Sequence, residues 1–293
     1  MSEPVIPSGD YPIRACAWPP RLGPPREGTV RMIGPEELPT WIVHEDERLL
    51  VLSKPGDVVC HPSKAGPWSS LVGAVREYTQ LPTVHLVFRL DRETSGVIVL
   101  AKDARMASRL QKAIQERRVG KRYQMIVWGE FREAVTVDQP LGTDMRSPVF
   151  IKSAVGPGRD AQAAVTHFKP MVSGGGFSLV EAVLETGRKH QIRAHAQWLG
   201  FPVVGDKIYG PSDRCYLDFI DRGWTSELAE KLLLPRQALH CAEIDLSPAG
   251  LPMVFGAPLA GDMRAFCAER MGLNAPELTP TPPTPWSPPP PAS

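Results

Sequence analysis

Proline is concentrated at the two ends of this 293-residue chain, and this limits where a packed domain can form. Of the 32 prolines, nine lie in residues 1–40 and nine in residues 276–293, which leaves 14 for the residues between. Proline fixes φ and lacks a backbone N–H, so Pro-rich ends favour extended coil over helix or sheet. The sequence therefore predicts a Pro-rich N-terminal extension over 1–40, a globular domain over 41–272 and a Pro-rich disordered tail over 273–293.

Charge and hydropathy argue against several classes of protein. The chain has 33 Lys and Arg against 32 Asp and Glu, so it lacks the overall positive charge of a nucleic-acid coat protein. It contains no run of about 18 apolar residues and no basic start followed by an apolar stretch, so we expect neither a membrane span nor a secretory signal. Its five cysteines form no CxxC pair, which argues against a zinc ribbon or a disulfide framework. These features fit a cytoplasmic protein.

Strands and helices alternate irregularly in the body of the chain. Apolar runs bounded by turn residues predict strands, whereas apolar residues three to four apart after a Ser or Asp cap predict helices. The expected strands cover 41–44, 49–52, 85–92, 97–100, 123–128, 165–168 and 177–184, and the expected helices start at Ser69 or Ser70, at Asp103 and at Lys189. Because the strands do not follow a regular βαβ order, the sequence predicts an α+β fold with a mixed or antiparallel sheet.

One candidate site surrounds Asp91, in the segment FRLDRETSG at 88–96. Asp91 lies between Arg89 and Arg92 on an expected strand, where alternation places Arg89 and Asp91 on one face. A guanidinium beside a carboxylate lowers its pKa, and an ionised carboxylate can act as a nucleophile. A surface ion pair would use the same residues, so this motif alone does not decide between the two readings.

A second candidate site is the segment TGRKHQIRAH at 186–195. A strand is expected to break at its glycine, and a helix then starts near Arg188 and Lys189, whose charges beside free helix N–H groups favour a phosphate. His190 and His195 are five residues apart and face different sides of a helix, so we predict no metal site. We expect His195 to be a packed histidine.

Positive charge is concentrated between Lys102 and Arg122, where eight basic residues stand against two acidic ones. Such a one-sided run favours a phosphate-binding face, although a solvated helix surface would have the same composition. Lys121 and Tyr123 stand at the start of an expected strand. There an aromatic ring beside basic side chains can stack on a nucleic-acid base or simply pack in the sheet. Both pairs of alternatives stay open at this point.

Together these segments resemble the RluA-type family of RNA pseudouridine synthases over about residues 41–270. The motifs occur in the family's order: DERLLVLSKPG at 46–56, RLDRETSG at 89–96, KRY at 121–123, TGRKHQIR at 186–193 and VGDKIYG at 204–210, with closing segments at 238–240 and 257–258. The resemblance implies an α+β fold with a mixed or antiparallel central sheet, flanking helices and an active-site cleft between two half-domains. The domain at 41–272 would then be the catalytic domain.

The resemblance also implies an isomerase that converts uridine to pseudouridine in ribosomal or transfer RNA, without a cofactor or metal. It implies that Asp91 is the catalytic aspartate, which as a nucleophile attacks the sugar or the base, or else assists a glycal route, and the sequence does not choose among these. It also implies that Tyr123 packs on a flipped-out target base and that Arg193 pairs with the carboxylate. We further expect a monomer. Phe88 replaces a histidine that is common among relatives, which affects the surroundings of Arg89 and not the assignment of Asp91. Expected substrate contacts are Arg89, Arg92, Lys121, Arg188 and His190.

Two other functions are compatible with parts of the sequence. A noncatalytic RNA-binding protein of the same fold would be expected to lack one of Asp91, Tyr123 and Arg193, and all three are present. A hydrolase that uses Asp91 with a histidine of the second site would need a positioned water and usually a metal or a second acid. Asp206 follows a glycine, which is typical of a loop residue.

Overall fold

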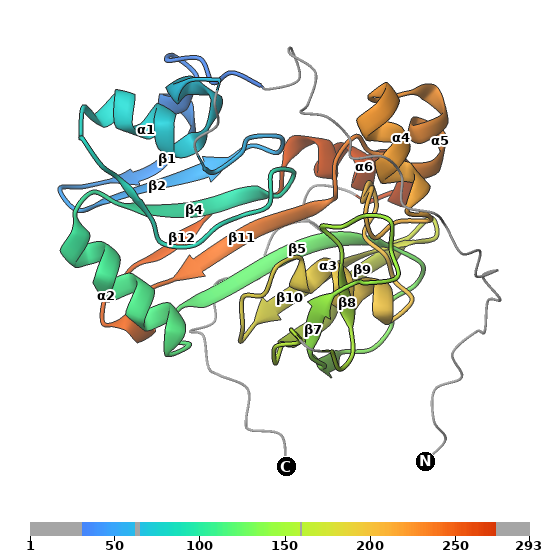
Figure 1. The fold of residues 1–293 in the computed structure, drawn as a ribbon. Helices are drawn as coiled ribbons and strands as arrows, with labels where there is room; N and C mark the ends of the chain where they lie inside the picture. Colours follow the sequence, from blue (N-terminus) through green and yellow to red (C-terminus); the bar gives the residue numbers. More distant parts are fainter. Residues whose placement is uncertain (1–30, 62–64, 159, 274–293) are drawn as a thin grey trace.

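The computed structural model describes residues 31–61, 65–158 and 160–273 (Figure 1). Most of the predicted N-terminal extension and nearly all of the predicted tail therefore lie outside the described residues. The described part of the extension packs on the body, because Ile33 and Leu38 are buried in the main core. The packed domain thus begins before residue 41, and a short 3₁₀ helix, Leu38–Trp41, leads into the first strand.

A ten-stranded sheet forms the centre of the described structure (Figure 1). Its order is β1-β2-β4-β11-β5-β10-β9-β6, with β3 paired to β4 and β12 paired to β11. The neighbours are antiparallel except β4 and β11, so the sheet is mixed, as predicted. The strands are β1 (Ile42–Glu45), β2 (Leu49–Lys54), β3 (His85–Leu86), β4 (Ser95–Ala101), β5 (Gly120–Trp128), β6 (Val135–Asp138), β9 (Val165–Gly174), β10 (Phe177–Leu184), β11 (Leu239–Asp245) and β12 (Val254–Gly256).

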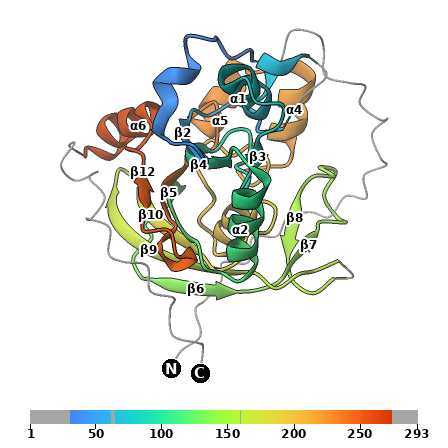
Figure 2. The ribbon, with the colours of Figure 1, turned by 90° about the vertical axis from the view of Figure 1, so that its left-hand side faces the viewer.

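Helices flank this sheet, and a small hairpin lies apart from it (Figures 1 and 2). The hairpin consists of β7 (Leu141–Thr143) and β8 (Ser153–Val155), which form a separate two-stranded sheet, and Leu141 also bridges Gln162. No helix in the described part of the chain is long and apolar enough to cross a membrane. The helices are α1 (Leu71–Thr79), α2 (Ala104–Gln115), α3 (Gln191–Trp198), α4 (Arg214–Arg222), α5 (Ser226–Leu232) and α6 (Gly261–Met271), with short 3₁₀ turns at Pro67–Ser69 and Ser247–Ala249.

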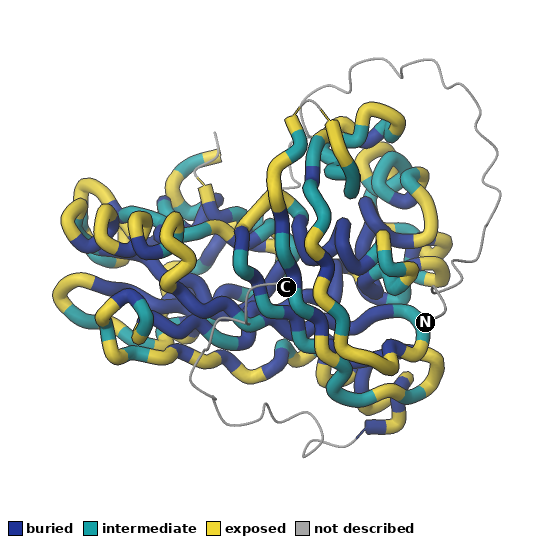
Figure 3. Tube along the Cα trace, turned by 90° about the horizontal axis from the view of Figure 1, so that it is seen from below, coloured by how far each residue is buried: buried dark blue, intermediate teal, exposed yellow. Residues whose placement is uncertain are grey.

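The central strands are covered on both faces. Every residue of β4 is buried, and Figure 3 shows buried segments through the middle of the molecule with exposed loops around them. Gly96 allows β4 to run close beside β11, because a Cβ at this position would lie 2.1 Å from the carbonyl oxygen of Cys241. Helix α2 buries Leu110 against this core. The carboxylate of Asp103 caps the N-terminus of α2 by accepting from the Met106 amide at 2.8 Å.

Two predictions of local structure were wrong, and both concern the candidate site. The strand expected over 85–92 stops at Leu86, and Asp91 lies in an irregular loop, so the strand alternation argued for Arg89 and Asp91 does not apply. The helix expected from Lys189 starts only at Gln191, because His190 adopts a left-handed conformation with φ 57°. The Gln191 side chain closes the preceding turn by accepting from the Arg188 amide at 2.9 Å.

The other expected elements were confirmed with small shifts at their ends. The hairpin β1–β2, the helix α2, the strand β5 and the pair β9–β10 all form where the sequence predicts them. Helix α1 is capped by Ser70, whose hydroxyl accepts from the Gly73 amide at 3.2 Å. These elements share strong local patterns and need little information from the rest of the chain.

Candidate active site

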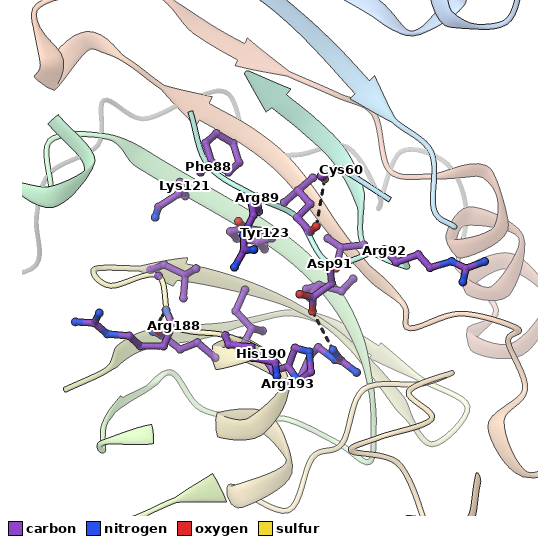
Figure 4. A pocket seen from close by; sticks show the side chains of 18 of the residues that line it. Cys60, Phe88, Arg89, Asp91, Arg92, Lys121, Tyr123, Arg188, His190 and Arg193 are labelled. Carbon is purple, nitrogen blue, oxygen red and sulfur yellow. Dashed lines mark hydrogen bonds and ion pairs between the residues drawn. The ribbon is translucent and has the colours of Figure 1, made fainter. Parts of the chain in front are cut away.

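A cavity of about 820 Å³ opens between the loop at 87–94, strand β5 and the turn that leads into helix α3 (Figure 4). The residues assigned to a site by the sequence come from three separate parts of the chain, and the fold brings all eight of them to this cavity. They are Asp91, Tyr123, Arg193, Arg89, Arg92, Lys121, Arg188 and His190.

Arg193 joins Asp91 to a second carboxylate. Its Nη1 donates to Asp91 Oδ2 at 2.9 Å, while its Nε and Nη2 donate to Asp206 Oδ2 and Oδ1 at 2.6 and 2.8 Å. The guanidinium is buried on the first turn of α3, where Asp206 fixes the orientation of its plane. The remaining edge of Arg193 therefore faces Asp91 in a defined geometry (Figure 4).

The charged form of Asp91 is favoured, although protein surrounds it closely. Burial, the largest single influence, would raise the pKa of this carboxyl. The charge of Arg193, the neighbouring His190 and the hydrogen bonds from Arg193 and Gln237 together outweigh burial and hold the pKa below its ordinary value. Burial lowers the pKa of His190 to about 4, so the ring is neutral near pH 7 and Arg193 is the cation that acts on Asp91. The lowered pKa keeps the carboxylate of Asp91 ionised near pH 7. The side chain is also 33% exposed, so the carboxylate is accessible from the cavity.

Side chains from distant segments hold the irregular loop that carries Asp91. Gln237 Nε2 donates to Asp91 Oδ2 at 3.4 Å, from the segment just before β11. Lys54, at the end of β2, donates from Nζ to the Arg92 carbonyl at 3.1 Å. Burial lowers the pKa of Lys54 to about 8, and its ammonium is bound by carbonyl oxygens. Because the loop at 87–94 lies outside the strands, such contacts replace a sheet ladder in fixing the position of Asp91.

Lys121 and Tyr123 both face the cavity because they are two residues apart on β5. Tyr123 lies opposite Cys241 in the pairing of β5 with β11. Burial, assisted by that thiol, raises the pKa of Tyr123 well above its ordinary value, so the phenol keeps its proton. Burial lowers the pKa of Lys121, whose ammonium has no hydrogen-bond or ion-pair partner among the described residues. A Cβ at Gly187 would lie 3.3 Å from Lys121 Nζ, so this glycine leaves room beside the ammonium.

The remaining four predicted residues differ in how far they are engaged by the protein. Arg89 forms no ion pair with the described residues, and it lines the same wall as Tyr123 (Figure 4). Arg92 points away from the other labelled side chains, and its Nε donates to Asp57 Oδ1 at 3.1 Å. Arg188 donates from Nε to a backbone carbonyl at 3.0 Å, and His190 shares a hydrogen bond with a neighbouring tyrosine hydroxyl at 3.1 Å.

The sequence of the chain matches a known family over the part that builds this cavity. The sequence model described as RNA pseudouridylate synthase matches residues 48–198, just over half of the chain. The chain belongs to this family. It is therefore an isomerase that converts uridine to pseudouridine in RNA.

Individual pseudouridine synthases are similar over most of the chain. The ribosomal large subunit pseudouridine synthase D of Vibrio parahaemolyticus is 32% identical over 238 residues, covering 79% of this chain and 70% of that one. The synthase of the same name from Escherichia coli K12 is 32% identical over 236 residues, covering 78% and 70%. The solved structure of human RNA pseudouridylate synthase domain containing 4 matches with a TM-score of 0.64 at 26% identity, over 82% of this chain and 96% of that one.

Sequence reasoning missed three polar residues of this pseudouridine synthase site. Asp206, interpreted as a loop residue, is fully buried and forms the two-bond pair with Arg193. The Tyr209 ring centroid lies 5.0 Å from the same guanidinium, and Gln237 contacts Asp91. Asp206 and Tyr209 belong to the VGDKIYG segment, and Gln237 directly precedes a closing segment. Their position in or beside these motifs is therefore the one sequence signal that could have identified them as site residues.

His195 does not take part in the cavity. Its Nε2 donates to the Gln139 carbonyl at 3.0 Å and its Nδ1 shares a hydrogen bond with the Thr166 hydroxyl at 2.9 Å, which confirms the packed histidine. Burial lowers the pKa of this ring. Within residues 31–61, 65–158 and 160–273, no group of three or more His, Cys, Asp or Glu side chains is arranged to hold a metal ion.

Proposed function

We propose that the chain isomerises specific uridines in ribosomal RNA and that Asp91 is its catalytic nucleophile. The observation that carries this proposal is the ion pair of Asp91 with the buried Arg193 in the wall of the 820 Å³ cavity. An ionised carboxylate that stays accessible is the group that nucleophilic catalysis requires. Ribosomal RNA is the proposed substrate because relatives at 32% identity are named ribosomal large subunit pseudouridine synthases.

The proposed reaction rearranges the nucleotide without a net gain or loss of atoms. The N1–C1′ bond between uracil and ribose breaks, the base rotates and its C5 bonds to C1′. The proton lost from C5 is balanced by a proton gained at N1. Asp91 supplies the carboxylate while base and sugar are apart and is regenerated when the new bond forms. Because the reaction is neither a redox step nor a hydrolysis, we propose that it uses no cofactor or metal.

Tyr123 and the cations of the cavity are proposed to hold the flipped-out nucleotide. Stacking on the Tyr123 ring offsets part of the few kcal/mol that unstacking a base costs. Arg89 and Lys121 have no counter-charge among the described residues, so both are available for a phosphate or a uracil carbonyl. Arg188 and His190 line the same cavity and extend this contact, while Arg92, bound to Asp57, is proposed as a contact at the rim.

A comparison of pseudouridine maps tests the function and the nucleophile together. Cells express the wild-type chain, Asp91→Ala or the matched control Asp221→Ala, which removes an exposed carboxylate from α4. Pseudouridine is then mapped across all ribosomal and transfer RNA. We expect sites in large-subunit ribosomal RNA that appear with the wild type and the control and are absent with Asp91→Ala.

Each other outcome overturns a defined part of the proposal. Sites that persist with Asp91→Ala exclude this residue as the nucleophile. Sites confined to transfer RNA exclude the proposed substrate and keep the chemistry. Identical maps with and without the wild-type chain, despite RNA binding by the purified protein, would favour the noncatalytic RNA-binding alternative.

The chain is further proposed to act as a monomer and in the cytoplasm. We propose a monomer, because the cavity is built entirely from residues of one chain. We propose the cytoplasm, because the four described cysteines are free and buried, as expected in a reducing compartment. Light scattering of the purified protein checks the first point, and fractionation of expressing cells checks the second.

A further inference from the structure

The loop of the β7–β8 hairpin holds two large apolar side chains in solvent. Met145 is 84% exposed and Phe150 is 72% exposed, more than the other large hydrophobic residues of the described chain. Figure 2 shows this hairpin at one edge of the molecule, apart from the ten-stranded sheet. Single exposed apolar residues are common, but an aromatic ring at this exposure on a projecting hairpin suggests a contact surface.

The hairpin loop is ordered by its own contacts, so the exposure of Phe150 is not a consequence of loose packing. Val149, directly before Phe150, is buried in a small second core. Ser147 Oγ donates to Asp213 Oδ2 at 2.6 Å, and Lys152 Nζ donates to Asp213 Oδ1 at 2.7 Å. The loop is thus held on both sides of Phe150, and the ring is directed outward by a fixed backbone.

The base of the hairpin is joined to the wall of the catalytic cavity. The Ser153 amide donates to the Tyr209 hydroxyl at 2.8 Å, and the Ser153 hydroxyl donates to the Lys189 carbonyl at 3.4 Å. Lys189 lines the cavity, and the Tyr209 ring packs on the guanidinium of Arg193. The hairpin therefore stands next to the turn that positions Arg193, at the rim where RNA around a target nucleotide has to pass.

The charges around Phe150 fit a nucleic acid better than an apolar protein surface. The loop over 144–152 carries Arg146 and Lys152 against Asp144. Lys152 is ion-paired, whereas the Arg146 guanidinium forms no ion pair with the described residues. The same holds for the exposed ammonium of Lys189 at the rim. An aromatic ring in a loop with a net positive charge and an unpaired guanidinium can bind a base by stacking and a phosphate by charge.

We propose that Phe150 stacks on a base that flanks the target uridine and that Arg146 binds a neighbouring phosphate. The hairpin would then contribute to the choice of uridine, in addition to the cavity that performs the reaction. This inference rests on the proposed function, because it requires RNA at the cavity rim. The proposed partner is RNA, and the experiment below distinguishes it from a protein that binds the same surface.

The experiment measures kcat and KM on a transcript of the ribosomal RNA region that carries the site mapped in cells. The variants are Phe150→Ala, Phe150→Trp and the control Tyr78→Ala, which removes a 37% exposed aromatic ring from α1, far from the hairpin in Figures 1 and 2. Loss of one stacked base predicts a KM increase of about tenfold for Phe150→Ala. We expect kcat to stay unchanged, Phe150→Trp to keep the wild-type KM, and Tyr78→Ala to have no effect.

Other results overturn the inference without affecting the proposed function. An unchanged KM in Phe150→Ala excludes the stacking contact. A KM that rises equally in Phe150→Trp shows that an aromatic ring is not what matters. Loss of modification in cells with a normal KM on the transcript indicates a protein partner instead. Asp91→Ala is measured in parallel, and its turnover tests the proposed function separately. If Asp91→Ala is inactive, the RNA affinity of the double variant Asp91→Ala/Phe150→Ala is compared with that of Asp91→Ala, and this comparison still tests the contact made by Phe150.

Discussion

Arg193 binds two carboxylates whose surroundings differ in nearly every respect. Asp206 is fully buried, and its two oxygens accept from Arg193 and from the amides of Ile208 and Tyr209, the latter two at 2.9 Å. Asp91 is 33% exposed, and both of its hydrogen bonds, from Arg193 and Gln237, end on Oδ2. Asp91 lines the cavity, and none of the described residues donates a hydrogen bond to its other oxygen, Oδ1.

The difference shows how one guanidinium can serve structure and chemistry together. A carboxylate whose lone pairs are occupied is stabilised as an anion and is a poor nucleophile, so Asp206 is suited to fixing Arg193. A carboxylate with one oxygen bound and the other open is held in position and remains able to form a bond. Two residues of the same type thus receive different roles from burial and from the number of donors around them.

The largest expected effect comes from exchanging each carboxylate for an amide of the same size. We expect Asp91→Asn to lower turnover by about 10³-fold or more and to change the free energy of unfolding by less than about 1 kcal/mol. We expect Asp206→Asn to lower the free energy of unfolding by about 3 kcal/mol, because Arg193 loses its buried counter-charge. Urea unfolding and single-turnover kinetics on the same samples measure both quantities. Equal stability losses in the two variants would contradict the division of roles.

The pH dependence of stability sharpens this comparison. Burial would raise the pKa of Asp206, but Arg193 and the backbone donors outweigh burial and hold the pKa below the ordinary value of 3.8. A group of this kind contributes stability above its unfolded pKa, and the contribution is lost as the pH falls through the lower folded pKa. The stability difference between the wild type and Asp206→Asn should therefore be largest near neutral pH and shrink below pH 3.8. A difference that stays constant into acid would contradict this account.

An intermediate effect is expected when Arg193 is replaced by a residue that keeps the positive charge but lacks the planar guanidinium. In Arg193→Lys, a single ammonium cannot donate in plane to both carboxylates, so we expect it to stay with Asp206 and leave Asp91. Turnover should fall by about 50-fold and the free energy of unfolding by about 2 kcal/mol. The pKa of Asp91 should rise toward its ordinary value, as followed by carboxyl-carbon NMR. A pKa of Asp91 that stays low in this variant would show that another group stabilises the anion.

The sequence predicts best those parts of the fold that depend on neighbours along the chain. Helix α2 has its Asp103 cap and apolar stripe within one segment, and β5 ends in the apolar run 125–128, so both appear where expected. The loop at 87–94 looks like a strand by composition. It is held instead by Lys54 and Gln237, which lie far from it in the chain, and no local pattern shows such contacts.

The candidate site follows the same division. Asp91, Tyr123 and Arg193 stand in motifs that can be recognised, whereas the role of Asp206 depends on burial that only the folded chain creates. The basic run at 102–122 also changes its meaning in the structure. Lys102 pairs with Glu45 and Arg109 donates to the Gly250 carbonyl at 2.9 Å, so part of its charge serves packing. Charge counted along a sequence does not separate cations with partners from those without.

The smallest expected effect concerns Gln237, the second donor to Asp91. Its bond to Oδ2 is long at 3.4 Å, so Gln237→Met should lower kcat by about fivefold and the free energy of unfolding by about 1 kcal/mol. Since this donor stabilises the charged form, its removal raises the pKa of Asp91, and the acidic limb of the kcat/KM profile should move to higher pH. Gln237→Glu adds a negative charge beside Asp91 and should move the limb further in the same direction. If neither variant moves the limb, the hydrogen bond from Gln237 does not act on the nucleophile, and Arg193 alone sets the contrast between the two carboxylates.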